Sequence, residues 1–83
     1  ADAATIHQIR TLDGQVHRGS WLDIVRQMRD GAGFHHESVS AFMRRMAERW
    51  HEQHGVEVPF KDPEVFLRAA VEYRLMILED GPA

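Results

Sequence analysis

The chain has 83 residues, 43% of them hydrophobic and 28% charged, with six histidines and no cysteine. This composition predicts one small soluble globular domain over residues 1–83, and it excludes disulfides, thiolate metal sites and thiol nucleophiles. The formal net charge of −3 lacks the basic excess of a general nucleic-acid binder, and no stretch is long and apolar enough to span a membrane.

Residues 5–20 predict a β-hairpin. Asp13 and Gly14 supply the positive φ angles of a tight two-residue turn between two extended arms. In that register Thr11 faces Val16 and Ile9 faces Arg18. One face of the hairpin then carries His7, Ile9, Thr11 and Val16. A three-residue loop with a left-handed glycine would shift the pairing by one residue, and the sequence leaves both registers open.

A first helix is predicted to begin after Ser20. Ser20 is a favourable N-cap, and the Asp23 carboxylate stands where it can reach back to the cap and complement the helix dipole. The buried stripe of this helix is expected to contain Trp21, Ile24, Val25 and Met28. Residues 31–33 end the helix, and Phe34 is expected to anchor the following loop on the core.

The longest predicted helix runs from about Glu37 to His54 and stops at Gly55, a C-cap glycine. Its polar side carries Arg44, Arg45, Glu48, His51 and Glu52. Its apolar arc gathers Val39, Phe42, Met43, Met46, Ala47, Trp50 and His54. We expect this helix to form the centre of the core, with Trp50 in the middle of the arc and His54 at the core edge or at the cap.

The last third of the chain begins with an alternating segment, residues 56–60, which predicts a short strand that Pro59 confines to a sheet edge or a strand end. Asp62 and Pro63 then begin a third helix, as N-cap and first helical residue. That helix is apolar except for one narrow stripe formed by Glu64, Arg68 and Glu72. Residues 75–78 either continue the helix or form a final strand, and the length of this apolar run favours the strand.

Together these elements predict an α+β fold. An N-terminal β-hairpin and one or two further short strands pack against three helices, in the order ββααβα with a possible final β.

Chemistry at the histidines has little support. His51 and His54 stand three residues apart, a spacing that lets two imidazoles share an ion but lacks the His-Glu-x-x-His pattern of zinc hydrolases. His35 and His36 lie roughly 23 Å from His51 along an intact helix. No nucleophile and no phosphate-binding glycine loop accompanies them. We therefore expect no metal, no cofactor, no catalytic residue and no enzymatic activity.

The arginines offer an alternative function. Arg44, Arg45 and Arg49, preceded by Arg26 and Arg29 on the first helix, could contact phosphates, and two helices joined by a glycine-containing loop permit a helix-turn-helix interpretation. Acidic residues one turn away disfavour nucleic acid as the partner. Glu48 is placed to pair with Arg44 and Arg45, Glu52 with Arg49, and Asp23 with Arg26.

The third helix and residues 75–78 need more apolar cover than a domain of this size readily supplies. We therefore expect a non-enzymatic protein-interaction or regulatory module that acts as a homodimer or as a subunit of a larger complex. The predicted interface consists of Phe66, Ala70, Tyr73, Leu75 and Ile77.

The origin of the chain is suggested by its basic residues, because nine of the ten are arginine. We interpret that bias as the signature of a GC-rich bacterial genome. The chain starts at Ala1 without a methionine, which could reflect methionine removal, an expression artefact or a cleaved signal peptide. The first explanation is the simplest, and it leads us to expect a cytoplasmic protein.

Overall fold

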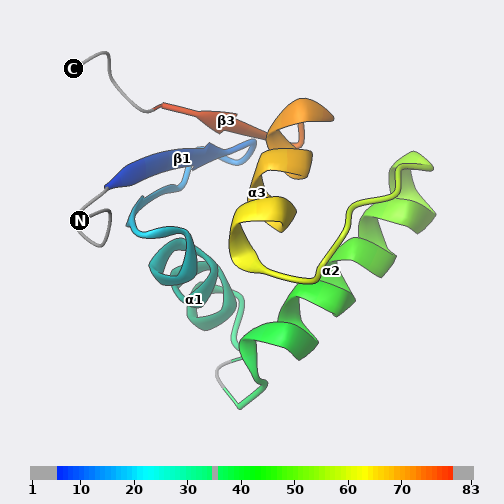
Figure 1. Cartoon of the computed structure of the whole chain (residues 1–83), viewed down its shortest axis with the longest axis horizontal. Helices are drawn as coiled ribbons and strands as arrows, with labels where there is room; N and C mark the ends of the chain where they lie inside the picture. Colours follow the sequence, from blue (N-terminus) through cyan, green and yellow to red (C-terminus); the bar gives the residue numbers. More distant parts are fainter. Residues whose placement is uncertain (1–5, 35, 80–83) are drawn as a thin grey trace.

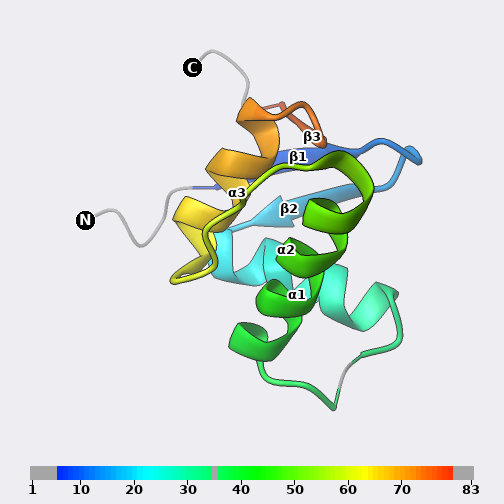
Figure 2. The ribbon, with the colours of Figure 1, turned by 90° about the vertical axis from the view of Figure 1, so that its right-hand side faces the viewer.

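In the computed structural model, which describes residues 6–34 and 36–79, a three-stranded antiparallel sheet packs against three helices. The strands are β1 (His7–Thr11), β2 (Val16–Gly19) and β3 (Met76–Leu78). The helices are α1 (Trp21–Gly31), α2 (Val39–His54) and α3 (Pro63–Glu72). All three helices lie on one side of the sheet, and no described helix covers its other face, here called the open face (Figure 1). The same arrangement is seen after a quarter turn (Figure 2).

The predicted α+β architecture is confirmed, including the final strand, and the described elements follow the order ββαααβ. The prediction of a strand over residues 56–60 is wrong, because this segment is an irregular connection between α2 and α3 (Figure 1). Its alternation has another cause. Val58 is buried and Val56 half-buried against the helices, without any strand beside them.

The hairpin adopts the shifted register. Arg10 faces Val16, and Ile9 faces His17 instead of Arg18. Gly14 is left-handed, with φ +92°, in a loop that the Thr11 N–H closes by donating to the Gln15 carbonyl at 2.8 Å. Because a one-residue slip moves a side chain to the other face, Val16 lies on the open face, 44% exposed, and not beside Ile9 as the two-residue turn predicts.

The predicted helix ends are confirmed almost residue by residue. Ser20 and Asp23 form a reciprocal capping box, in which the Asp23 N–H donates to the Ser20 hydroxyl at 3.1 Å. Helix α2 begins one residue after its N-cap Ser38, slightly later than expected, and ends at the left-handed Gly55. Asp62 caps α3 through its side chain. No described helix has both the length and the apolar character needed to cross a membrane.

The core lies between the sheet and the helices. Trp50 of α2 stacks on Phe66 of α3 with ring centroids 5.4 Å apart. The buried hydrophobic residues are Ile9, Ile24, Val25, Met28, Phe42, Met43, Ala47, Trp50, Val58, Phe66, Leu67, Ala70, Leu75 and Met76. Phe34 packs against this cluster, as predicted. His54 does not, because the last turn of α2 extends beyond the core and leaves this side chain exposed.

Candidate protein-interaction groove

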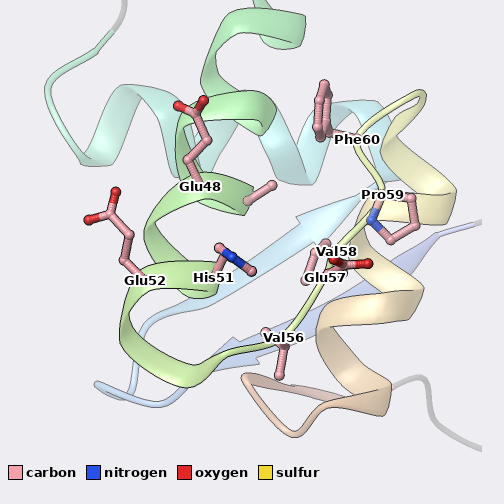
Figure 3. Close-up of a pocket in the computed structure, with 9 residues that line it drawn as sticks. Glu48, His51, Glu52, Val56, Glu57, Val58, Pro59 and Phe60 are labelled. Carbon is pink, nitrogen blue, oxygen red and sulfur yellow. The ribbon is translucent and has the colours of Figure 1, made fainter.

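A groove runs between α2 and the segment that follows it. The left-handed Gly55 reverses the chain, so that residues 56–60 run back beside the C-terminal half of the helix (Figure 3). The groove is open to solvent and has a volume of about 760 Å³. It is lined by Ala47, Glu48, His51, Glu52, Val56, Glu57, Val58, Pro59 and Phe60.

The rim of the groove is acidic. Glu48 and Glu52 stand on the α2 wall and Glu57 on the opposite wall, with His51 extending from α2 between them (Figure 3). No lysine or arginine is among the nine lining residues. The Arg44 Nε lies 3.8 Å from Glu48, and both side chains are more than 60% exposed, so this pair neutralises little of the negative potential.

Apolar groups form the base of the groove. Val58 and Ala47 are almost completely buried there, whereas the Phe60 ring, at the end of the segment, is 44% exposed. Large aromatic rings contribute most to binding when a partner covers them. The groove therefore combines apolar groups at its base with three glutamates on its two walls.

Phe60 also marks a change of charge along α2. It lines a second hollow, of about 660 Å³, at the N-terminal end of the helix. That hollow contains Arg44 and Lys61 and, among its six lining residues, no carboxylate. The surface beside α2 thus passes from basic at its beginning to acidic along its second half.

The five residues predicted for a partner interface do not share a surface. Phe66 and Ala70 are fully buried and Leu75 is 8% exposed, so these three belong to the core of the chain itself. That part of the prediction is wrong because Trp50 covers Phe66 and the final strand packs against α3. Tyr73 and Ile77 are 46% and 49% exposed and stay available.

The predicted arginine cluster is divided among different contacts. Arg45 pairs not with Glu48 but with Glu37, to which its Nε and Nη2 donate at 2.9 and 2.8 Å. Its guanidinium also lies over the Phe34 ring, 4.7 Å from the centroid. Arg49 lines a separate cleft near the hairpin loop. Among the described residues, the expected pairs of Arg49 with Glu52 and of Arg26 with Asp23 are not formed, because Asp23 caps α1 instead.

The contact between Arg45 and Glu37 predicts a pH-dependent stability. The hydrogen bonds from Arg45 lower the pKa of Glu37 below its ordinary value. A carboxyl with a lowered folded-state pKa adds stability above its unfolded pKa and loses it as the pH falls through the folded value. Arg45→Gln should therefore lower the melting temperature at neutral pH. The part of this decrease that comes from the lost ion pair should disappear in acid, where Glu37 is protonated in both proteins.

Thermal melts between neutral pH and about pH 2 measure this difference. Arg44→Gln is the matched control, because its ion pair with Glu48 is longer and highly exposed. A deficit for Arg45→Gln that stays constant over the whole pH range would show that only the packing on Phe34 matters.

The histidines lie in separate places. His51 is in the groove, His54 is exposed, and His7 stacks on Trp21 with ring centroids 3.7 Å apart. His17 is nearly buried in the sheet face that the helices cover. Over residues 6–34 and 36–79, no three histidine or acidic side chains lie close enough to hold a metal ion. His35 is outside the described residues.

The groove is absent from the expectations based on sequence. The spacing of Glu48 and Glu52 on α2 and the acidic Glu57 just after Gly55 are the signals that could have indicated it. From the sequence alone, the two α2 glutamates belong to an ordinary solvated helix face, and Glu57 belongs to the predicted strand. No family model, curated protein or solved structure matches this chain.

Proposed function

We propose that this chain is a non-enzymatic protein-interaction module, a subunit of a larger complex, that holds a short segment of a partner protein in the groove beside α2. The observation that supports the proposal is the set of three glutamates on the walls of a groove with an apolar base, at one end of which Phe60 is exposed. A complementary segment carries lysine or arginine on either side of an aromatic or aliphatic residue. Opposite charge attracts and orients the segment, and the apolar contact supplies affinity.

The shape of the groove favours a peptide over a small molecule. Small-molecule sites usually enclose most of the ligand surface, whereas this groove has two walls and is open above. Its nine lining residues include three glutamates and one histidine but no serine, threonine or cysteine. Their chemistry suits recognition of a cationic chain more closely than covalent catalysis.

The nucleic-acid alternative has less support. Arg45 is already occupied by Glu37 and Phe34. Glu48 and Glu52 lie on the same helix and would repel a phosphate backbone that reached along it. Arg44 and Arg49 line different hollows. This distribution of the arginines favours a peptide over a phosphate backbone as the partner.

Selection from a random peptide display library tests the proposal. Peptides retained by the wild-type chain should be enriched in lysine or arginine flanking an apolar residue, and raised salt should weaken their binding. The variant Glu52→Lys/Glu57→Lys should lose the selected peptides, because it reverses charge on both walls of the groove. Glu72→Lys makes the same change on α3, outside the groove, and should retain them.

The result decides between the groove and other surfaces. Failure to enrich any peptide, enrichment of acidic peptides, or equal binding to the groove variant and the wild type would each refute the proposal.

A further inference from the structure

The two edge strands of the sheet, β2 and β3, differ in whether their outward-facing backbone groups have hydrogen-bond partners. At the β2 edge, the backbone of Arg18 points away from β1 and bonds to the side-chain amide of Gln27 on α1. The Arg18 N–H donates to Gln27 Oε1 at 3.3 Å, and Gln27 Nε2 donates to the Arg18 carbonyl at 2.7 Å. One amide side chain thereby takes the place of a neighbouring strand at Arg18.

The β3 edge is open in the part of the chain that the structure describes. The Glu79 N–H donates to the Gln8 carbonyl at 2.7 Å, which fixes the bonding pattern between β3 and β1. Antiparallel bonding alternates along a strand, so Ile77 bonds to β1 while the N–H and C=O groups of Met76 and Leu78 point outward. Figure 1 shows β3 along the outer rim of the sheet.

Apart from belonging to a short strand of three residues, residues 76–78 carry none of the features that usually protect an edge. They are all apolar, with no lysine or proline. Ile77 is 49% exposed, Leu78 37%, and the nearby Tyr73 46%. An accessible apolar edge of this kind is a template for another strand.

We propose that this edge pairs with β3 of a second copy of the chain, antiparallel about a two-fold axis at Ile77. Met76 of each copy then lies opposite Leu78 of the other, and the outward N–H and C=O groups of both copies bond to each other. The two Ile77 side chains meet on the open face as a cross-strand apolar pair. The two sheets become one continuous sheet.

Two observations favour a second copy of the chain as the partner that pairs with β3: the charges at the two ends of the strand, and the symmetry of the resulting dimer. Arg74 precedes the strand, and Glu79, whose carboxylate Arg10 already binds at 2.8 Å, follows it. Antiparallel pairing brings Arg74 of each copy near the Glu79 carboxylate of the other, whereas parallel pairing would bring the two Arg74 side chains together. In a two-fold dimer, the open β3 edge of each copy pairs with the open β3 edge of the other. Because Gln27 already bonds to the Arg18 backbone at both outer edges, these edges offer fewer unpaired groups to a further copy, and we expect the assembly to stop at two copies.

Sedimentation equilibrium of the whole chain tests the proposal. The wild type should be dimeric at tens of micromolar. Leu78→Pro should be monomeric, since proline removes the N–H that bonds only across the dimer, and edge positions of this kind tolerate proline. Ile77→Lys should also be monomeric. Val16→Lys makes the same change on the open face at the far strand and should remain a dimer, as should the groove variant Glu52→Lys/Glu57→Lys.

Hydrogen exchange gives a second readout, which holds even if Leu78→Pro fails to fold. The amides of Met76 and Leu78 should be protected, and their protection should fall on dilution. A monomeric wild type would refute the proposal that a second copy pairs with β3. In that case the edge would remain available to a strand of another protein. A dimer in which these amides exchange freely, or one that survives Ile77→Lys, would place the contact elsewhere and also refute it.

Discussion

Replacing Trp50 with alanine is expected to lower the free energy of unfolding by about 3–5 kcal/mol, the usual cost of removing a large aromatic side chain from a core. Trp50 is 8% exposed and stacks on Phe66 with ring centroids 5.4 Å apart. Its ring therefore joins α2 to α3. Alanine would leave a cavity between these two elements.

The expected loss is large relative to the total free energy of unfolding of the chain. A domain of 83 residues has a total stability of about 4–12 kcal/mol, from roughly 0.05–0.15 kcal/mol per residue. Trp50→Ala should therefore be close to global unfolding at room temperature. Chemical denaturation followed by circular dichroism measures the change in the free energy of unfolding.

Trp21→Ala is the matched control for Trp50→Ala. Trp21 is only half-buried, and it packs against His7 and under the guanidinium of Arg68 at the surface. Its removal should cost clearly less. Equal losses for the two variants, or a midpoint for Trp50→Ala close to that of the wild type, would contradict the central position assigned to Trp50.

The helices were predictable because their signals are local. Ser20 with Asp23, and Asp62 with Pro63, satisfy backbone groups within one turn, so a short window of sequence contains the whole interaction. Gly55 ends α2 by a left-handed conformation that glycine adopts without strain. These caps depend little on the rest of the fold.

The sequence left the hairpin register open, because both loop lengths use Asp13 and Gly14. The errors occur where contacts between distant segments determine the structure. Val56 and Val58 alternate as in a strand, but they pack on helices. Phe66 and Ala70 appear available for a partner until β3 and Trp50 cover them. In each case a contact between residues far apart in sequence overrides the local pattern.

The groove could not be predicted for the same reason. Glu48, Glu52 and Glu57 form one rim only because Gly55 turns the following segment back along α2, and the direction of that segment depends on where α3 packs. The acidic residues of α2 could be recognised in the sequence. The position of residues 56–60 as the opposite wall of the groove could not be predicted.

Gly19→Ala is expected to destabilise the fold by about 2–4 kcal/mol, from backbone strain together with loss of a helix cap. Gly19 has a φ of +142°, in a region that residues with a side chain rarely adopt. A methyl group there would lie 2.8 Å from the Cβ of Asp23, which holds the capping box of α1 with Ser20. The chain turns sharply at Gly19 from β2 into α1, so the strain cannot relax without moving one of the two elements.

Gly31→Ala provides the contrast for this effect. Gly31 ends α1 with no positive φ, and an added methyl would make only an ordinary contact, 3.9 Å from the Gln15 amide oxygen. Alanine has the higher helix propensity, so this variant should gain about 0.5 kcal/mol. Denaturation midpoints of both variants should therefore move in opposite directions from the wild type. A neutral Gly19→Ala would mean that the turn between β2 and α1 adapts to a side chain and that the capping box does not depend on glycine at this position.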